Sequence, residues 1–495
     1  MYYYIAVVVV CIIIYVLFQW SQSGKGIVSV LVLGDMGHSP RMQNHVACLV
    51  SMGLKVQFIG YLESDLPEQI NTSKLVKTVP LMPLPNSINA LPRTTRYFAK
   101  FAFQTFQLTF VLLYRVHKSR CLLLQSPPAI PTLLVACLTG LIRGWEVCVD
   151  WHNYGYTLMG LQLGDTHGIV KLARLYERAF ARLINNNFCV TQAMRDDLLL
   201  FWGVQAITLY DKPNPQRFKG KIPPKIAHQL FTTLADKYDI FGSKNRTGTK
   251  FTMVENGICK YKDDRPLLLI SSTSWTEDED FGILLEALKL YEIAKMNRSD
   301  LPNVVCAITG KGPLRQHYES EISKLKFSSV EIVTLWLEVG DYPKLLATAD
   351  LGVSLHTSSS GLDLPMKIVD MFGSDLPVLA RKFRCIGELV QDSKNGFVFT
   401  TSNELCDKLI KLGNGFPKDC KLLSNLQRQI QTDRTTETWQ KVWDREARPY
   451  FKRKSKPIGL YITRLVIILI GISAGIGLIR LMGLSYLFNA LSADI

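Results

Sequence analysis

The sequence predicts an α/β protein whose two doubly wound lobes face a cleft, with an N-terminal transmembrane anchor and a C-terminal hydrophobic segment. Three observations predict it: a βαβ pattern after Gly26, a second βα series after Arg265, and an apolar run near each end of the chain. With 495 residues, of which 47% are hydrophobic, the chain is long enough for two cores. A single core stops growing at about 250–300 residues, so one small domain is excluded.

Residues 1–22 are predicted to form the anchor. The run 2–20 contains no charged residue and has about the 20 residues that a helix needs to cross the hydrocarbon layer of a bilayer. A cleaved signal peptide is the alternative, but nothing basic precedes the run, and it ends in the bulky Phe18 and Trp20. Because Lys25 and a basic body follow the run, the positive-inside tendency places the body in the cytosol.

A second hydrophobic membrane segment is predicted at residues 457–488. Its apolar stretch 465–488 contains one charged residue, Arg480, and several glycines that lower helix propensity. Crossing the bilayer and lying in its interface therefore both remain open. The basic cluster 452–456 in front of it is expected to lie at an anionic, cytosolic headgroup layer.

The net charge of +15 indicates an acidic partner, for which nucleic acid, anionic lipid and phosphorylated substrates are the usual classes. The chain has no recognisable nucleic-acid-binding module, and nucleic acid would not explain an anchor, so none is expected as a partner. Eleven scattered cysteines without a CxxC pair indicate reduced thiols facing the cytosol rather than a zinc site or a disulfide framework.

The first lobe is predicted at residues 23–215. After Gly26 an apolar strand runs into a loop rich in Gly, Asp and Ser, followed by a helix and a second strand. Further strands of this lobe are predicted at 120–125, 146–151 and 187–190. Residues 216–264 are rich in Pro, Gly and polar residues and have weak periodicity, which predicts an interlobe linker with an irregular insertion.

The second lobe is predicted at residues 265–430, and a return helix with a basic juxtamembrane segment at 431–456. Apolar strands alternate with helical patterns in the second lobe, which is typical of another doubly wound sheet. In such sheets ligands bind beyond the carboxyl ends of the strands. The strands of this lobe are predicted at 265–273, 303–310, 331–336, 351–355 and 377–380.

In the loop at residues 34–40 of the first lobe, glycines let a ligand approach the backbone closely, and a helix begins at the end of the loop. This combination suits a phosphate or a sugar hydroxyl. Gly37 and Ser39 are therefore candidate acceptor-binding residues. Asp35 and His38 are candidates for a general base. An ordinary strand-to-helix turn is the alternative.

A strand end at residues 148–155 concentrates polar and aromatic side chains, as substrate-contacting strand ends do. Asp150 and His152 are two further candidates for the base, and the sequence does not rank the four. Asn153 and Tyr154 are candidate acceptor-binding residues. A capped strand with a packed tryptophan is the alternative.

Two strand ends in the second lobe are predicted to bind a donor. Ser272 and Thr273 offer hydroxyl groups, while most of the acids that follow them are expected to cap a helix. Lys311 and Gly312 lie in a Thr-Gly-Lys-Gly-Pro turn that resembles a reduced phosphate cradle, although the P-loop pattern is absent. A simple turn is the alternative for this segment.

The segment 358–378 places a helix start near Leu364, with Lys367 and Asp370 three residues apart on one helix face. A cation for phosphate and a carboxylate for ribose hydroxyls are what a nucleotide requires, and a surface ion pair is the alternative. The backbone of Trp336 and Leu337 is predicted to read a base edge. No metal-binding motif such as DxD lies on a loop, so no metal site and no required cofactor are expected, and Mg²⁺ at most stimulates.

The segment 358–378 resembles the retaining GT-B glycosyltransferases, whose pattern is E-x7-E followed by A-M-A-x-G-x-P-V. This alignment places Asp370 at the second acidic position and Leu362 at the first. Ser374 and Asp375 stand where a small residue and glycine are more usual.

A closer resemblance, covering about residues 27–445, is to the chitobiosyldiphosphodolichol β-mannosyltransferases. The segments that carry it are GDMGHSPRMQNH, DWHNYGYTL, STSWTEDEDF, TGKGP and SSSGLDLPMKIVDMFG. It implies transfer of mannose from GDP-mannose to GlcNAc2-diphosphate-dolichol, in β-1,4 linkage with inversion, on the cytosolic face of the endoplasmic reticulum membrane. It also implies a complex with other early mannosyltransferases of lipid-linked oligosaccharide synthesis. Another GT-B transferase with a lipid-linked acceptor, or an inactive GT-B scaffold subunit, are the alternatives.

Overall fold

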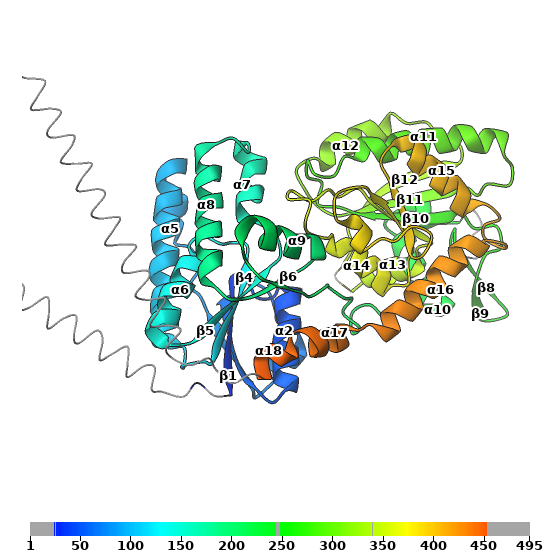
Figure 1. Cartoon of the computed structure of the whole chain (residues 1–495). Helices are drawn as coiled ribbons and strands as arrows, with labels where there is room; N and C mark the ends of the chain where they lie inside the picture. The colour runs from blue at the N-terminus through cyan, green and yellow to red at the C-terminus, as the bar shows by residue number, and fades with distance from the viewer. Residues whose placement is uncertain (1–23, 25, 244–247, 339, 453–495) are drawn as a thin grey trace, which may run out of the picture.

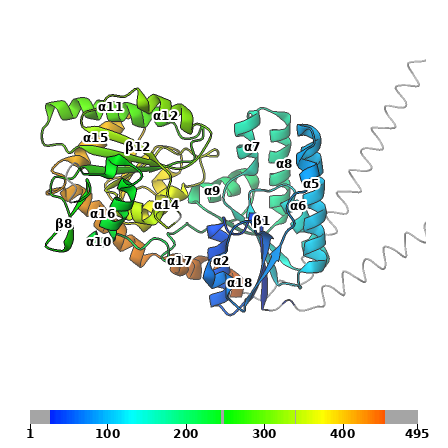
Figure 2. The ribbon, with the colours of Figure 1, turned by 180° about the vertical axis from the view of Figure 1, so that it is seen from behind.

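The computed structural model describes residues 24, 26–243, 248–338 and 340–452. Two α/β lobes lie side by side, and the C-terminal helices run from the second lobe back to the first (Figures 1 and 2). The predicted anchor at 1–22 and the hydrophobic segment at 457–488 lie outside the described residues. Within the described part of the chain, no helix combines the length and the apolar character that crossing a bilayer requires.

The first lobe is built on a seven-stranded parallel sheet of order β3-β2-β1-β4-β5-β6-β7. The chain reverses its direction of progress between β1 and β4, as a doubly wound sheet does. The predicted fold class is therefore confirmed for this lobe. Its strands are β1 (Ile27–Asp35), β2 (Lys55–Tyr61), β3 (Val76–Pro80), β4 (Cys121–Ser126), β5 (Glu146–Trp151), β6 (Asn186–Cys189) and β7 (Ile207–Thr208).

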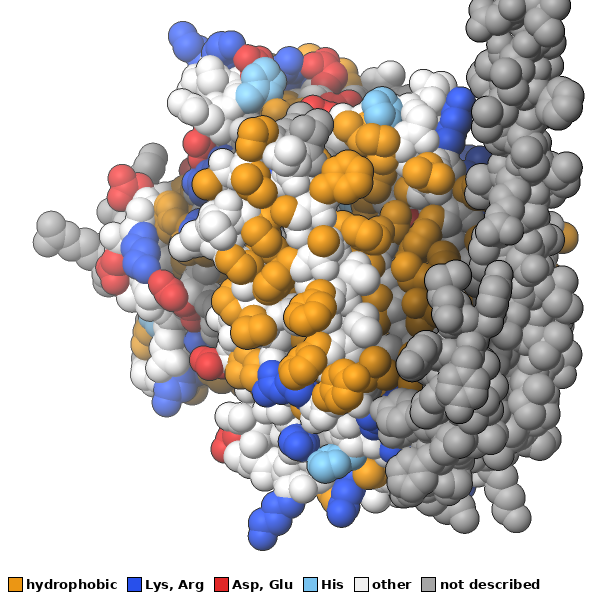
Figure 3. All heavy atoms as spheres, turned by 90° about the vertical axis from the view of Figure 1, so that its left-hand side faces the viewer, with side chains coloured by type: hydrophobic (Ala, Val, Ile, Leu, Met, Phe, Trp, Pro, Cys, Tyr) orange, Lys and Arg blue, Asp and Glu red, His pale blue; other side chains and the backbone are white. Residues whose placement is uncertain are grey.

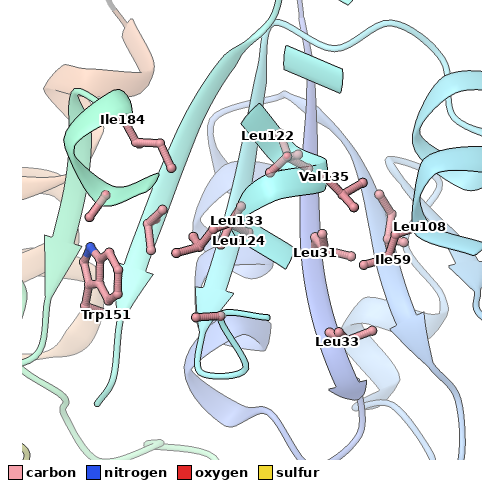
Figure 4. Close-up of a cluster of buried hydrophobic side chains, with 14 of the residues drawn as sticks. Leu31, Leu33, Ile59, Leu108, Leu122, Leu124, Leu133, Val135, Trp151 and Ile184 are labelled. Atoms are coloured by element: carbon pink, nitrogen blue, oxygen red, sulfur yellow. The ribbon is translucent and has the colours of Figure 1, made fainter. Parts of the chain in front are cut away.

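Helices cover both faces of this sheet because the side chains of its buried strands alternate between two apolar faces. Val30 of β1 packs in one core cluster with α2, α17 and α18, whereas Leu31 packs in the other with α5 and α6 (Figure 4). The helical elements of the lobe are α2 (Pro40–Ser51), α3 (Glu68–Asn71), α4 (Asn86–Asn89), α5 (Arg93–Phe110), η1 (Val111–Arg115), α6 (Thr132–Arg143), α7 (Gly155–Leu163), α8 (Gly168–Leu183), α9 (Gln192–Asp197) and η2 (Leu198–Trp202).

The second lobe repeats the same topology in a six-stranded parallel sheet of order β12-β11-β10-β13-β14-β15. Its switch point lies between β10 and β13. The strands are β10 (Leu267–Ser272), β11 (Val304–Thr309), β12 (Val330–Leu335), β13 (Leu351–Ser354), β14 (Val378–Arg381) and β15 (Gly396–Phe399). The helical elements are α11 (Phe281–Asn297), α12 (Arg315–Ser323), α13 (Tyr342–Thr348), α14 (Met366–Gly373), η4 (Ile386–Glu388) and α15 (Ser402–Gly413).

The segment predicted as linker and insertion, 216–264, is largely part of the second lobe. Phe231 of α10 (Pro224–Ala235) and the nearby Phe241 and Phe251 are fully buried against β10 and β11. These aromatic side chains fill one face of the sheet, which weak periodicity in the sequence did not reveal. The segment also contains η3 (Asp239–Phe241) and the antiparallel pair β8 (Thr252–Glu255) and β9 (Ile258–Tyr261).

The predicted return to the first lobe is made by three helices, α16 (Lys421–Thr436), α17 (Trp439–Glu446) and α18 (Arg448–Lys452). Leu423 and Leu426 of α16 pack in the core of the second lobe, while Trp443 of α17 packs with the first. The C-terminal part of the chain therefore contributes to the cores of both lobes.

Candidate active site

The carboxyl ends of the two sheets face each other, and polar contacts cross between them. Asn153, just beyond β5, donates from Nδ2 to the Ser359 hydroxyl at 3.2 Å and to Asp363 Oδ1 at 2.9 Å in the loop after β13. Thr191, just beyond β6, donates its hydroxyl to the Leu362 carbonyl at 2.5 Å. The predicted acceptor and donor loops therefore meet at one boundary.

The loop after β1 is organised by the Asp35 carboxylate. Its Oδ1 accepts from the backbone N–H groups of Gly37 at 3.2 Å and Glu63 at 3.1 Å, and its Oδ2 lies 2.6 Å from His38 Nδ1. Although partial burial opposes it, hydrogen bonds from Ser64, His38 and the two backbone N–H groups hold the pKa of Asp35 far below its usual range. Asp35 is thus a weak base that fixes the loop, which argues against its predicted catalytic role.

The other predicted residues of this loop have different surroundings. The His38 side chain is 80% exposed, and besides Asp35 it contacts the Ser64 hydroxyl at 3.0 Å. Gly37 lies so close to Ser64 that a Cβ there would come within 2.7 Å of the Ser64 carbonyl oxygen. Ser39 donates its hydroxyl to the Asp35 carbonyl at 3.0 Å. Acceptor binding by Gly37 and Ser39 stays a prediction.

Asp150, at the end of β5, is fully buried and receives four hydrogen bonds. Arg41 of α2 binds it through both Nε at 2.7 Å and Nη2 at 2.8 Å, and His45 and His152 approach its Oδ2 at 3.1 and 3.0 Å. Burial alone would raise the pKa of Asp150, but the Arg41 guanidinium and the two imidazoles hold it well below its usual range. The predicted role of Asp150 as the base is therefore corrected: its oxygens are occupied.

The proton of His45 can be assigned from its two partners. The indole Nε1 of Trp443 can only donate, and it lies 3.0 Å from His45 Nδ1, so Nδ1 accepts. The proton is then on Nε2, which donates to Asp150. Burial lowers the pKa of His45 and so favours this neutral form.

His152 differs from the other candidates because it is both oriented and accessible. Its side chain remains 22% exposed while Nε2 donates to the Asp150 carboxylate at 3.0 Å. That hydrogen bond leaves Nδ1 as the nitrogen with a free lone pair. Since Asn153, the next residue, contacts the second lobe, His152 lies beside the lobe boundary. It is the candidate base that the geometry favours.

Two predicted acceptor-binding residues next to His152 are engaged elsewhere. Tyr154 is buried, stacks on Trp202 with ring centroids 4.6 Å apart, and donates its hydroxyl to Asp197 at 3.0 Å. Its predicted contact with the acceptor is therefore corrected, since a packed aromatic ring has no free polar edge. Asn153 is also buried, and its amide bridges the lobes.

In the second lobe, the loops after β10 and β11 lie directly against each other. A Cβ on Gly310 would come within 1.8 Å of the Thr273 carbonyl oxygen, and one on Gly312 within 1.7 Å of the Ser274 carbonyl oxygen. Trp275 Nε1 donates to the Gly310 carbonyl at 3.2 Å. Both glycines are thus required by close backbone approach, and Lys311 between them is held at the rim, its Nζ 3.6 Å from the centroid of the Trp336 ring.

The change Gly312→Ala is expected to raise the dissociation constant for a nucleoside diphosphate by at least about tenfold, because the methyl group pushes the two loops apart. Titration of the nucleotide against tryptophan fluorescence measures this change. Gly340→Ala is the matched control, since a Cβ at that glycine meets nothing within 4 Å. Equal affinity in both variants would contradict nucleotide binding at this loop.

Lys367, near the start of α14, forms an ion pair with Glu279 rather than with Asp370. Glu279 is buried and also accepts from the Thr273 hydroxyl at 2.5 Å and the Ser274 N–H at 2.8 Å. Lys367 is therefore a partly neutralised cation that ties α14 to the loop after β10. Among the acids of that loop, Asp280 caps α11, accepting from the Gly282 N–H at 3.0 Å. The prediction that most of these acids cap the helix is wrong, because Asp278 pairs with His356 and Glu279 with Lys367.

Asp370 lies one turn further along α14, beside Tyr342 and Arg217. Burial raises the pKa of Asp370 to about 7, an effect that the positive charge of Arg217 opposes. The Tyr342 hydroxyl donates to Ser272 at 3.1 Å, and the Arg217 guanidinium lies 5.9 Å from the Tyr342 ring centroid. Ser272, Asp370 and a cation are thus gathered at the switch point between β10 and β13.

The raised pKa of Asp370 predicts a pH-dependent stability. The folded protein retains a proton that the unfolded chain releases between the usual value of 3.8 and about 7, so stability falls as pH rises through that window. Asp370→Asn, which cannot ionise, is expected to gain thermal stability relative to the parent between about pH 5 and about pH 7.5. A difference in melting temperature that stays constant across this range would contradict the raised pKa.

The backbone at the end of β12, which was predicted to bind a nucleotide base, is already hydrogen-bonded to a side chain. The Tyr238 hydroxyl accepts from the Trp336 N–H at 3.1 Å and lies 3.4 Å from the Trp336 carbonyl, so a base could be read there only by displacing Tyr238. Leu337 is partly buried against the core of the lobe, and Leu364 borders a cavity of about 330 Å³ together with Val369 and Phe372. Donor binding by Leu337 and Leu364 stays a prediction.

Comparisons with known proteins bear on this geometry. Residues 265–414 match the family described as glycosyl transferases group 1. A sucrose-phosphate synthase from Thermosynechococcus elongatus aligns with 85% of this chain and 96% of its own, at 11% identity and a TM-score of 0.57, which shows the GT-B fold. The mouse (Mus musculus) chitobiosyldiphosphodolichol β-mannosyltransferase is 42% identical over 428 residues, covering 85% of this chain and 88% of the mouse protein. The chain belongs to this family. The human (Homo sapiens) protein of that name is 40% identical over 431 residues, covering 86% and 92%.

As a member of the β-mannosyltransferase family, the chain is a glycosyltransferase. At the two positions aligned with the E-x7-E pattern, it has one carboxylate. Leu362 is buried in the core of the first lobe, with its carbonyl bound by Thr191, whereas Asp370 faces the switch point of the second lobe. The predicted donor side of this mannosyltransferase therefore lacks the first acidic residue of the retaining pattern.

The turn after α14 in this mannosyltransferase contains Asp375 where glycine is more usual. Asp375 has a φ of 54°, and its carboxylate accepts from Arg434 Nε of α16 at 2.7 Å. Its Oδ2 also lies 3.3 Å from the Lys221 N–H. A positive φ is unfavourable for aspartate, whereas glycine adopts it freely. The hydrogen bonds of Asp375 to two other segments of the second lobe offset this cost.

Several residues of the site were not singled out from the sequence. Arg41 and His45 are four apart in α2 and so share a face, but no pattern indicates that this face meets Asp150. Trp443 is 398 residues from His45 in the chain. Glu279 is one of several acids of which most were expected to cap a helix, and Arg217 lies at the edge of the predicted linker.

Proposed function

We propose that this glycosyltransferase transfers mannose from GDP-mannose to dolichyl-diphosphate-linked GlcNAc2, forming a β-1,4 linkage with inversion. Support for the acceptor comes from family membership, since the relatives are named for chitobiosyldiphosphodolichol. Support for inversion comes from one observation: a partly exposed imidazole, His152, is fixed by the buried Asp150 at the boundary with the second lobe. Inversion by direct displacement requires one base of this kind and no covalent intermediate.

In the proposed reaction, His152 Nδ1 accepts the proton of the attacking acceptor hydroxyl. The hydroxyl oxygen forms a bond to the anomeric carbon of mannose as the bond to the diphosphate oxygen breaks, and GDP leaves with the bonding electron pair. The Asp150 carboxylate stabilises the imidazolium that forms, because it receives the Nε2–H hydrogen bond. No atom of the enzyme becomes bonded to the sugar.

The leaving diphosphate needs positive charge and N–H donors. Lys311 lies at the rim of the glycine loop that leads into α12, and Arg217 lies beside Asp370, so these cations are proposed to neutralise it. Asp370 and Ser272 are proposed to bind ribose or sugar hydroxyls. No cofactor is required in this scheme, and Mg²⁺ is proposed only to stimulate.

The body is proposed to face the cytosol at the endoplasmic reticulum membrane, alone or in complex with other early mannosyltransferases of the pathway. The uncharged run 2–20 and the basic residues that follow it support this orientation.

The test is mannosyl transfer by the purified, detergent-solubilised protein from GDP-mannose to phytanyl-diphosphate chitobiose, with the linkage of the product determined by NMR. Lys311→Ala and Asp370→Asn are expected to lose most of the activity. Lys289→Ala, which removes an exposed pair with Glu286 on α11, is the matched control and is expected to keep it.

Transfer only from a different nucleotide sugar would favour the alternative of another transferase with a lipid-linked acceptor. Absence of transfer from every donor, with folded protein and intact acceptor, would favour the inactive scaffold.

A further inference from the structure

One side of the first lobe exposes an unusual number of large apolar side chains. They lie on α5, η1, α7 and α8, and Figure 3 shows apolar side chains gathered on the side of the molecule where α5 and α8 lie. We call this surface the apolar face. Its members include Phe98, Phe106, Phe110, Tyr114, Leu158, Leu161, Ile169, Leu172 and Leu175.

The apolar face is not the margin of a core. On α8, Ile169, Leu172 and Leu175 recur at three-residue spacing and point outward, while Val170 and Ala173 point into the lobe. Phe98 is 79% exposed and Leu172 65% exposed. A contiguous apolar surface of this kind on a single protein marks an interaction site, because leaving it in water is unfavourable.

The charged residues on the same helices are almost all basic. Among the described helices α5, α6, α7 and α8, the sole acidic residue is Glu177, and it is buried. Two of these helices, α5 and α8, also carry the exposed basic residues Lys100, Lys171, Arg174, Arg178 and Arg182. Arg174 lies over the Tyr156 ring, and Arg182 donates to the Trp202 carbonyl. Lysine and arginine can lay their aliphatic stems along an apolar layer while their charged ends reach phosphate groups. This mixture complements an anionic phospholipid surface.

The first and the last described segments of the chain meet in the first lobe. The Arg120 N–H donates to the Ile27 carbonyl at 2.9 Å, and its side chain binds the Tyr450 carbonyl at 3.0 Å. Ile27 and Tyr450, near the first and the last described residues of the chain, therefore both lie beside Arg120, which follows η1 closely in the sequence.

We propose that the apolar face docks on the surface of an anionic phospholipid bilayer, with the side chains of α5, η1, α7 and α8 inserted at the headgroup boundary. This contact is additional to any that the terminal segments make. It also fixes the distance between the candidate active site and the bilayer, because α7 begins directly after Asn153 and Tyr154 and carries Leu158 and Leu161 of the face. A lipid-linked diphosphate could then reach the lobe boundary from the bilayer surface, a consequence that rests on the proposed function.

The docking is tested on the full chain in nanodiscs of phosphatidylcholine and phosphatidylserine that contain doxyl-labelled lipid. A fluorescent amino acid is introduced at Phe98, at Leu172 or, as control, at Ile293, which is 58% exposed on α11 of the second lobe. The lipid is expected to quench the first two positions at least about threefold more than the third. Equal quenching at all three positions, or none at Phe98 and Leu172, would overturn the proposal whether or not the protein is active.

Two other occupants of the face would be recognised with a photo-crosslinking amino acid at Phe98 and Leu172. Crosslinks to peptides from residues 1–23 or 457–488 would mean that the terminal segments cover the face. Crosslinked dimers would mean that a second copy does. Either result overturns the proposal, whereas crosslinks to lipid support it.

A functional arm uses the double variant Phe98→Asp, Leu172→Asp, with Ile293→Asp as control. The double variant is expected to raise KM for a long-chain lipid-linked acceptor in nanodiscs by about tenfold and to leave KM for a short, water-soluble acceptor unchanged. An equal rise for both acceptors would indicate damage to the site rather than loss of docking, and the quenching experiment would then decide alone.

Discussion

Replacing His152 with alanine is expected to lower kcat for mannosyl transfer by about 10²–10⁴-fold, the usual contribution of a positioned general base. The affinity for the nucleotide should change little, because His152 lies on the first lobe and the predicted donor contacts lie on the second. Single-turnover rates together with nucleotide titration separate these two quantities.

His38→Ala is the matched control for this prediction. His38 is the more exposed imidazole, and its partners are Asp35 at the end of β1 and Ser64 in the loop after β2, both outside the lobe boundary that His152 borders. Its loss is therefore expected to change kcat by less than about threefold. If His38→Ala were the inactive variant and His152→Ala the active one, the base would lie in the loop after β1 and the proposed mechanism would be wrong.

Asp150→Asn is expected to destabilise the first lobe by about 3 kcal/mol, because it removes the charge that compensates the buried Arg41. Asp211, whose Oδ1 lies 2.9 Å from Arg41 Nη1, should keep the loss near the lower end of the range for a broken buried pair. For a lobe of this size, that loss corresponds to a fall in melting temperature of about 6–12 °C. Thermal unfolding followed by circular dichroism in detergent measures it.

The control for Asp150→Asn is Asp263→Asn, which removes an ion pair with Lys418 in which both side chains are largely exposed. Exposed pairs contribute little, so its melting temperature should stay within about 2 °C of the parent. A similarly small effect for Asp150→Asn would mean that the buried network is not a source of stability.

Much of the fold could be predicted because buried parallel strands are continuous apolar runs. The predicted strand 146–151 coincides with β5, and that at 303–310 brackets β11. The segment 216–264 was harder, since Phe231, Phe241 and Phe251 are separated by polar residues and become a cluster only when α10 and its neighbours fold onto β10. Separated aromatic residues give no periodic signal.

The candidate site could likewise be predicted in part. Sequence patterns located the loops after β1, β5, β10 and β11, and the structure places these loops at the carboxyl ends of the two sheets. The patterns could not assign roles within them. Asp150 and Tyr154 are as polar in the sequence as His152, yet only burial and partners distinguish a fixed carboxylate and a packed ring from an accessible imidazole.

The sequence by itself determined that this protein has two doubly wound lobes and which loops carry its polar groups, because strand and helix periodicity and glycine spacing are local properties of the chain. Only the tertiary structure decided that Lys367 pairs with Glu279, and that Trp443 of α17 sets the tautomer of His45 beside Asp150. These contacts join residues far apart in the chain, so their partners, charge and burial exist only once the two sheets and the returning helices have packed.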